Sequence, residues 1–310
     1  QTTDSIASLR FSGNGGSVLL GASQTLTISS GGLYATGNNS TSGQVIAGGA
    51  GITTGGTTSL YYFSDSANGG VSVQTPILAT TTGGLVVSAA VAPLELAAAN
   101  TFTGGVWLNS GNARVAFAET AGTSGPLGAS GTIRFNGGTL QYSSANTFDY
   151  SSRFSTEAGQ LYNVNTNGQN VSWAANLTSA GGTLTKVGTG NLTLTGSNAL
   201  VGITGSAGFI IVGGANALGT GTVTLSGGGL SADASPRTVT NPVAFTADTN
   251  LQSSTSSAAL TLAGPVSFPS SAITITVPNG AANPPEISGS ISGSNTALTL
   301  GNGTNLILSG

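Results

Sequence analysis

Residues 223–230 read Val223-Thr-Leu-Ser-Gly-Gly-Gly-Leu230 and join one short strand to the next through a glycine turn. Side chains of a strand point alternately to its two faces, so Val223 and Leu225 are predicted to face a core and Thr224 to face water. The glycines permit the positive φ that a sharp corner requires. The same unit recurs as Leu26-Thr-Ile-Ser-Ser-Gly-Gly-Leu33 and Ile133-Arg-Phe-Asn-Gly-Gly-Thr-Leu140.

Two further patterns recur around this unit. One reads Leu94-Glu-Leu-Ala-Ala-Ala-Asn-Thr-Phe-Thr-Gly-Gly105, then Leu192-Thr-Leu-Thr-Gly-Ser-Asn-Ala-Leu-Val-Gly202, and begins again at Leu306-Ile-Leu-Ser-Gly310. The other is a Leu-Gly step, at Pro126-Leu-Gly128 and Ala217-Leu-Gly219. Equivalent copies lie roughly 90 to 115 residues apart, with shorter strand–turn units between them. Self-similarity of this kind is typical of repeat architectures.

The composition indicates an all-β protein with very many turns. Only 5% of the 310 residues are Asp, Glu, Lys or Arg, and 50 are glycines, whereas about 25% charged residues and about 7% glycine are usual. With 38% hydrophobic residues the chain can bury a core, which a disordered chain cannot. Cysteine, histidine and methionine are absent, which excludes a disulfide framework and suits an exposed extracellular protein. A pI near 4.6 removes the electrostatic basis for binding nucleic acid.

Each strand–turn unit offers too few inward aliphatic side chains to bury a core alone. Stacking the units edge to edge makes one continuous core and pairs the backbone groups between coils. We therefore predict a parallel β-helix, or β-solenoid, built from irregular strand–Gly turn repeats. It would run as one continuous segment over residues 1–310, as part of a longer chain or of a polymer.

The most apolar stretch, Leu85–Ala99, is also predicted to be strand rather than helix. An amphipathic helix over Ala89–Asn100 is the alternative, but Pro93 lies in its middle and the matching copy at Leu192 is strand-like. A membrane-spanning helix needs about 20 apolar residues, and Pro93 and Glu95 interrupt this shorter run. No membrane span is therefore predicted.

The repeats resemble those of a known family. Gly181–Gly196 reads Gly-Gly-Thr-Leu-Thr-Lys-Val-Gly-Thr-Gly-Asn-Leu-Thr-Leu-Thr-Gly and is similar to the autotransporter-associated β-strand repeat, as is Leu94–Gly105 with its Ala-Asn-Thr-Phe-Thr-Gly-Gly. The opening Ser8–Ser12, followed by Leu26–Leu33, resembles the arrangement ahead of the first repeat in very long bacterial autotransporter-like passenger domains. The resemblance covers most of the chain in pieces. It implies a right-handed β-helix that is exported and displayed on the bacterial surface.

Few side chains can carry chemistry. Without His and Cys, a Ser-His-Asp triad, a cysteine nucleophile and a His-liganded metal are all excluded. The sole lysine, Lys186, follows Thr185 and not glycine, so there is no phosphate-binding Walker loop. Calcium sites of the repeat-in-toxin kind need Asp recurring with Gly in nonapeptides, and no such run exists. We predict no catalytic, cofactor-binding or metal-binding residues, and no cofactor.

One charged stretch allows two interpretations. Residues 148–157 read Phe-Asp-Tyr-Ser-Ser-Arg-Phe-Ser-Thr-Glu. Asp149, Arg153 and Glu157 could converge beside Tyr150 in a loop site of the kind that glycan-cutting β-helix enzymes use, which needs two carboxyl groups about 5 to 9.5 Å apart. The alternative is a surface turn with an ion pair worth about 0–1 kcal/mol, and the sequence favours this structural interpretation.

Aromatic and threonine patterns allow binding functions. Tyr61-Tyr62-Phe63 is the strongest aromatic cluster. It could be a sugar-stacking platform or an inter-subunit contact. The sequence favours the structural alternative, in which alternate rings cover the core or cap a coil. Trp107 and Trp173 lie in alternating strands and are predicted to be packing residues. Regular Thr-x-Thr arrays can bind ice, but their spacing here is irregular. The steps are Thr183/Thr185, Thr193/Thr195, Thr222/Thr224 and Thr274/Thr276.

The sequence therefore favours an extracellular structural or adhesive β-solenoid, a non-catalytic rod or filament subunit on a bacterial surface. The alternatives are a β-helix enzyme acting on polysaccharides and a flat-faced glycan-binding or ice-binding module. Expected partners are copies of the protein, packed end to end or laterally, or further repeats of the same chain, together with surface glycans. Neither end of the chain has a visible cap, and solenoid ends expose unpaired strand edges.

Overall fold

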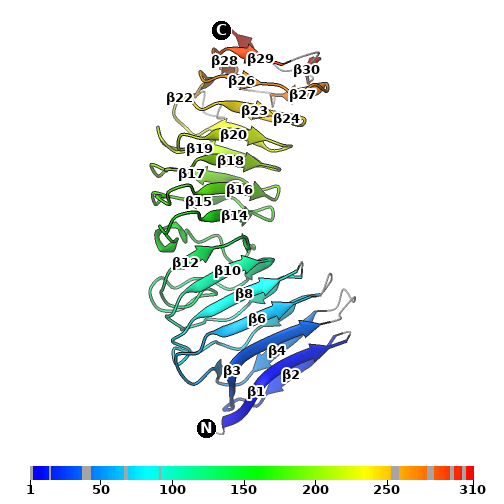
Figure 1. The fold of residues 1–310 in the computed structure, drawn as a ribbon, viewed down its shortest axis with the longest axis vertical. Helices are drawn as coiled ribbons and strands as arrows, with labels where there is room; N and C mark the ends of the chain where they lie inside the picture. The colour runs from blue at the N-terminus through cyan, green and yellow to red at the C-terminus, as the bar shows by residue number, and fades with distance from the viewer. Residues whose placement is uncertain are drawn as a thin grey trace. The chain divides into compact units, whose positions relative to one another are not determined.

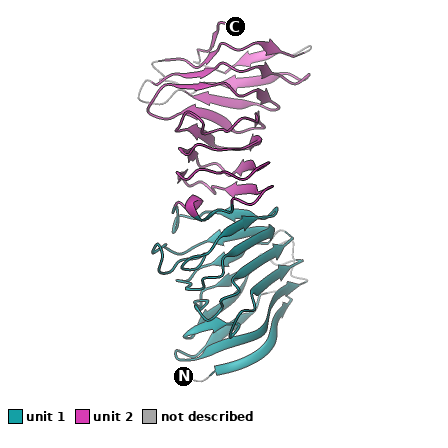
Figure 2. Ribbon diagram, turned by 60° about the vertical axis from the view of Figure 1, so that its left-hand side comes forward, with its two compact units in different colours: residues 1–148, 153–155 teal, residues 149–152, 156–310 magenta. Residues whose placement is uncertain are grey.

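The structure is a computed structural model that describes residues 3–13, 15–36, 43–65, 69–90, 92–252, 258–277, 283–293, 297–301 and 305–310. Contacts divide the chain into two compact units, which Figure 2 colours separately. Unit 1 comprises residues 1–148 and 153–155, and unit 2 comprises residues 149–152 and 156–310. Within the described ranges every element is a β-strand except one 3₁₀ turn, η1 (Ser151–Arg153). The all-β prediction is confirmed.

Unit 1 is built from two parallel sheets, whose strands follow one another in Figure 1. The first sheet runs in the order β1 (Thr3–Ser12), β3 (Thr25–Thr36), β6 (Leu60–Ser64), β8 (Leu85–Ala89), β10 (Val106–Ser110) and β12 (Ile133–Phe135), with β5 (Gly51–Thr53) also paired to β3. The second contains β2 (Ser17–Leu20), β4 (Gln44–Gly48), β7 (Val71–Val73), β9 (Leu94–Leu96), β11 (Asn112–Val115) and β13 (Thr139–Gln141). Each successive coil of the chain thus adds a strand to both sheets.

Unit 2 repeats this plan with a third sheet. One sheet holds β14 (Leu161–Asn165), β16 (Thr183–Val187), β18 (Gly202–Gly205), β20 (Thr222–Leu225), β23 (Val243–Phe245), β26 (Val266–Ser267) and β29 (Ile291–Ser292). The next holds β15 (Val171–Trp173), β17 (Leu192–Leu194), β19 (Phe209–Val212), β21 (Gly229–Ala232), β24 (Thr249–Gln252), β27 (Ile273–Thr276) and β30 (Leu298–Leu300). The third holds β22 (Arg237–Val239), β25 (Leu260–Leu262), β28 (Glu286–Ile287) and β31 (Ile307–Leu308).

Strand pairing within each unit is parallel and joins consecutive coils. In unit 1 a short coil leads from Leu94 to its partner Ala113, and a long coil leads from Gly32 to its partner Tyr61. In unit 2 a short coil leads from Thr183 to Gly202. The predicted parallel β-solenoid is confirmed. The right-handed sense and the continuity of one solenoid over residues 1–310 stay predictions.

The core consists of aliphatic columns that run from coil to coil. Val223 and Leu225 are fully buried and Thr224 is half-exposed, as the alternation predicts. The column through Val223 contains Ile203, Val243 and Val266, all buried. Each fully buried aliphatic side chain contributes about 1.5–3 kcal/mol, so stability comes from repeating the same contact at each coil.

Glycine pairs turn the chain from one sheet to another in two of the three repeats. Gly137 and Gly227 have φ of +127° and +103° and connect β12 to β13 and β20 to β21. The prediction of a corner at Leu26–Leu33 is wrong, because β3 continues through it as one strand. Both halves of β3 pair with β1, and the register shifts there, so Gly31 lies in a bulge instead of a corner.

In the structure, the asparagine of the second repeat pattern connects neighbouring coils. Asn100 accepts a hydrogen bond from the backbone N–H of Ile77 on the preceding coil (2.8 Å) and donates one to the carbonyl of Pro126 on the following coil (2.7 Å). Asn198 does the same between Leu177 (2.8 Å) and Ala217 (2.6 Å). Each asparagine therefore bridges three coils, and its acceptor carbonyl lies in or beside the recurring Leu-Gly step.

The apolar stretch Leu85–Ala99 forms strands β8 and β9 and no helix, with Val91 outside the described residues. The expectation of strand over an amphipathic helix is confirmed. In the described part of the chain, no helix has the length and hydrophobicity that crossing a membrane requires.

Candidate functional site

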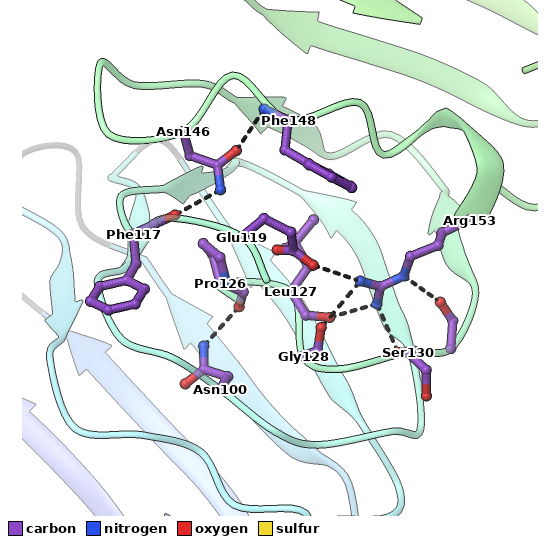
Figure 3. Close-up of polar contacts among 11 residues, drawn as sticks. Asn100, Phe117, Glu119, Pro126, Leu127, Gly128, Ser130, Asn146, Phe148 and Arg153 are labelled. Atoms are coloured by element: carbon purple, nitrogen blue, oxygen red, sulfur yellow. Dashed lines mark hydrogen bonds and ion pairs between the residues drawn. The ribbon is translucent and has the colours of Figure 1, made fainter. Parts of the chain in front are cut away.

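Arg153, the basic residue of the predicted charged site, donates hydrogen bonds to backbone carbonyls. Figure 3 shows its guanidinium held in a loop of unit 1. It donates hydrogen bonds of 2.7 to 3.2 Å to the carbonyls of Leu127, Gly128, Ser130 and Gly131. Its Nη1 also forms an ion pair with Oε1 of Glu119 (3.8 Å), whose side chain is almost fully buried. These guanidinium N–H groups stabilise the loop, and because they already bind backbone carbonyls they are not free to bind a substrate.

The two acids of the predicted site lie in unit 2. Asp149 accepts hydrogen bonds from the backbone N–H groups of Ser151 and Ala174, both at 2.8 Å, and so ties η1 to the next coil. Tyr150 is fully buried. Glu157 is exposed, and its carbonyl accepts a hydrogen bond from Ser179 (2.6 Å). These contacts fit the structural interpretation of the turn.

A polar cavity that the sequence did not predict lies on the second sheet of unit 1. Ser72, Glu95 and Arg114 occupy one outward column of β7, β9 and β11. Ser72 donates to Glu95 (2.9 Å), and Arg114 pairs with Glu95 at 3.1 Å. With Gln44 and Gln74 they line a cavity of about 480 Å³. The residues of the column come from three successive coils, so only the register brings them together.

Two polar atoms of this cavity lack hydrogen-bond partners in the described structure, Gln44 Oε1 and Arg114 Nε. Gln44 is 1% exposed, so its amide oxygen is desolvated. Among the described lining residues Glu95 is the one carboxylate, whereas glycoside hydrolysis by the usual route needs a pair. The cavity can therefore accept hydrogen-bonding ligands, but its described lining does not supply that pair.

The aromatic cluster divides between core and surface. Tyr62 is 1% exposed and packs inside, whereas Tyr61 and Phe63 are 47% and 46% exposed on the outer face of the first sheet of unit 1. Trp173 is buried, as expected. Trp107 was predicted to be a packing residue but points outward, half-exposed, with the guanidinium of Arg134 5.1 Å from its ring centroid. The register places Trp107 two strands from Tyr61.

The threonine steps do not form a regular array. Thr183/Thr185 and Thr222/Thr224 share one face of unit 2, but the coil between them carries Gly202 with Thr204. Thr193 lies on another sheet, in β17. Residues 3–13, 15–36 and the other described ranges contain no group of three or more Asp or Glu side chains placed to hold a metal ion.

Lys186 points into the core of unit 2 and is fully buried. Its ammonium donates to the carbonyls of Gly188 (2.8 Å) and Ala207 (2.7 Å) and to the hydroxyl of Thr166 (3.3 Å). Burial lowers the pKa of Lys186 from 10.5 to about 8. Its contacts fasten β16 to the adjacent coils. In the sequence, only the strand alternation that groups Lys186 with Leu184 indicates this inward position.

We expect replacement of Lys186 by methionine to remove a rise in stability above pH 8. Below about pH 8 both folded and unfolded states carry the ammonium, and the cost of burying it is fully present. Between pH 8 and 10.5 the unfolded chain holds the proton more tightly, so the free energy of unfolding increases with pH. Relative to Lys186→Met, the unchanged protein should gain about 2 kcal/mol from about pH 7 to about pH 9.5.

Urea unfolding at the two pH values measures this gain. Burial raises the pKa values of Tyr62 and Tyr162, and such acids lower stability above about pH 10 in both proteins. The comparison with the variant therefore isolates the lysine. Equal pH dependence in the two proteins would contradict the expected titration of Lys186 in this range.

No protein-family model matches this chain, and no curated protein or solved structure matches it either. The parallel pairing and the buried columns define the class directly: the chain is a β-solenoid protein.

Proposed function

We propose that the protein is an extracellular, non-catalytic β-solenoid with a structural or adhesive function on a bacterial surface. The observation that carries the proposal is that several of its few charged side chains bind the backbone of adjacent coils. Arg153, Asp149 and Lys186 do so in the contacts given above. Such residues maintain stacking and are not left to act on a substrate.

Unit 2 contains two more examples. Arg237 pairs with Asp233 through two hydrogen bonds (2.8 and 2.7 Å) and also donates to the carbonyl of Gly213 on the preceding coil (2.8 Å). These hydrogen bonds hold the pKa of Asp233 below its usual range. Asp248 accepts a hydrogen bond from the backbone N–H of Thr274 on the next coil (2.7 Å). Charge thus serves the same structural purpose along the unit.

The composition supports an extracellular location. The chain lacks the side chains most open to oxidation, Cys and Met, and its surface is rich in neutral hydroxyl and amide groups. The similarity of Gly181–Gly196 to the autotransporter-associated repeat supports export and surface display.

Further coils of the same kind are proposed as partners, in the same chain or in other copies, together with surface glycans. Leu300 and Leu308 follow the buried Ile275 and Ile287 in two core columns but are 44% and 54% exposed. Another layer of strands on β30 and β31 would bury them. Exposed strand edges are ready templates for such pairing.

Protease treatment of intact producing cells tests the location. We expect the protein to be degraded while a cytosolic marker survives, because a surface β-solenoid is accessible from outside. Incubation of the purified protein with a panel of polysaccharides tests the absence of catalysis, and no reducing ends should be released. Survival of the protein on intact cells contradicts surface display, and release of reducing ends contradicts a non-catalytic function.

A further inference from the structure

Two aromatic side chains form the walls of a slot on the outer face of unit 1. Tyr61, Val86 and Trp107 lie in register on the adjacent strands β6, β8 and β10. Since neighbouring strands are about 4.8 Å apart, the backbones that carry the two rings are roughly 9.6 Å apart. Val86 lies between them as a low floor. The space is a cavity of about 320 Å³, which Ser59 and Asn109 complete.

Trp107, one wall of the slot, packs against its neighbours. A Cβ added to Gly84 would lie 3.0 Å from Cζ3 of Trp107, so the indole packs against backbone that only glycine leaves open. Arg134, on the strand beyond β10, lies over one face of the indole, 5.1 Å from its centroid. The face of Trp107 that borders the cavity is therefore the opposite one, toward Val86 and Tyr61.

The rim of the slot carries neutral hydrogen-bonding groups. Asn109 donates to Ser88 (3.3 Å) and accepts from Asn136 (3.0 Å), so its amide is oriented within a small network. Ser59 donates to the carbonyl of Gly83 (2.7 Å), and its oxygen can accept a further hydrogen bond. The lining residues that the structure describes include no carboxylate and no amine. Apolar walls with a few placed polar groups are typical of small-ligand sites.

These features select a class of ligand. A sugar ring that packs against both aromatic side chains must be apolar on both of its own faces, and a gluco-configured pyranose meets this condition because its hydroxyl groups are equatorial and its axial positions are C–H. Its hydroxyls then point outward to the rim, toward Ser59 and Asn109. A β-1,4-linked chain of such sugars is extended, so the residues on either side can continue over the open sheet.

We propose that the slot between Tyr61 and Trp107 binds one gluco-configured pyranose of a neutral β-linked polysaccharide. A glycan ligand would supply the contact that the adhesive function requires, and the proposal rests on the proposed function in this respect. Phe63 and Tyr34, exposed on the same face with ring centroids 6.4 Å apart, lie outside the slot lining.

Affinity electrophoresis of the whole protein in gels containing hydroxyethyl cellulose tests the proposal. We expect the unchanged protein to be retarded, and Tyr61→Ala and Trp107→Ala to weaken the apparent affinity about ten-fold or more, as for central aromatic contacts. Phe63→Ala is the matched control, because Phe63 is equally exposed on the same strand but outside the slot, and it should bind within about two-fold of the unchanged protein. A β-1,4-galactan, with an axial oxygen on each ring, should retard the protein far less.

Val86→Phe adds a test that keeps both walls. The larger side chain fills the floor of the slot and should abolish retardation while the melting temperature, followed by circular dichroism, shows that all variants are folded. Equal retardation by galactan, equal loss in Phe63→Ala, or no retardation of the unchanged protein would overturn the slot. A further outcome would also overturn the proposal: the unchanged protein binds no glycan and forms a dimer that Tyr61→Ala dissociates. The face would then be an interface between two copies of the protein.

The slot and the proposed function fail in different ways. If the unchanged protein is not retarded, the proposed glycan site is rejected, and the proposed structural function of the β-solenoid is unaffected. Release of reducing ends from a retained polysaccharide would support the slot and contradict the non-catalytic function.

Discussion

Asn198→Ala is expected to lower the free energy of unfolding by about 2–6 kcal/mol. The side chain is 8% exposed and satisfies two backbone groups on two different coils, the N–H of Leu177 and the carbonyl of Ala217. Alanine leaves both buried groups without a partner, and each such group costs about 1–3 kcal/mol. Urea unfolding followed by circular dichroism measures the change.

Asn176 provides the matched control for this substitution. Its side chain is exposed and accepts a hydrogen bond from the backbone N–H of Ser197 (2.7 Å). In Asn176→Ala that N–H can bond to water, so we expect a loss of about 1 kcal/mol or less. Equal losses in the two variants would show that Asn198 bridges the coils with no more effect than a surface asparagine.

Asn100 extends the same expectation to unit 1. It is fully buried and bridges Ile77 and Pro126. The repeat that the sequence displays as Leu-x-Leu followed by Asn is therefore a repeat of one inter-coil contact, and the two units have the same requirement at this position.

The sequence predicted those features that depend on neighbouring residues. Alternation placed Val223 and Leu225 in the core, and glycine pairs predicted the corners at Gly137 and Gly227. The corner expected at Gly31 is wrong because a glycine with positive φ fits a bulge as well as a turn. Whether a bulge or a turn forms depends on whether the next segment returns to the same sheet. That is a property of the whole coil.

Features that depend on the register between coils could not be predicted. Coil length varies within unit 1, as the short coil that ends at Ala113 and the long coil that ends at Tyr61 show. No constant offset therefore relates Arg114 to Glu95 or Trp107 to Tyr61. A change of one residue in a coil would turn either member of a pair to the opposite face. For this reason only the structure shows the polar cavity and the aromatic slot, although the sequence allows Tyr61 as part of a sugar-stacking platform.

The recurring Leu-Gly step leads to the second large expected effect, in Gly219→Ala. Gly219 has φ +65°, which costs an L-residue about 1–2 kcal/mol. An added Cβ would also overlap the backbone of Leu200 on the preceding coil, and forced overpacking costs about 1–3 kcal/mol or more. We therefore expect the free energy of unfolding to fall by about 3 kcal/mol or more, measured by urea unfolding.

Gly181→Ala separates the two causes of that loss. Gly181 has nearly the same φ, +72°, but no atom lies within 4 Å of an added Cβ, so this variant bears the conformational cost alone, about 1–2 kcal/mol. The difference between the variants then measures how closely the coils approach at the Leu-Gly step. A Cβ added to the equivalent Gly128 would overlap Phe102 in the same way. If Gly219→Ala were no less stable than Gly181→Ala, the glycine of the step would be needed for its φ alone, and close coil packing would not explain its recurrence.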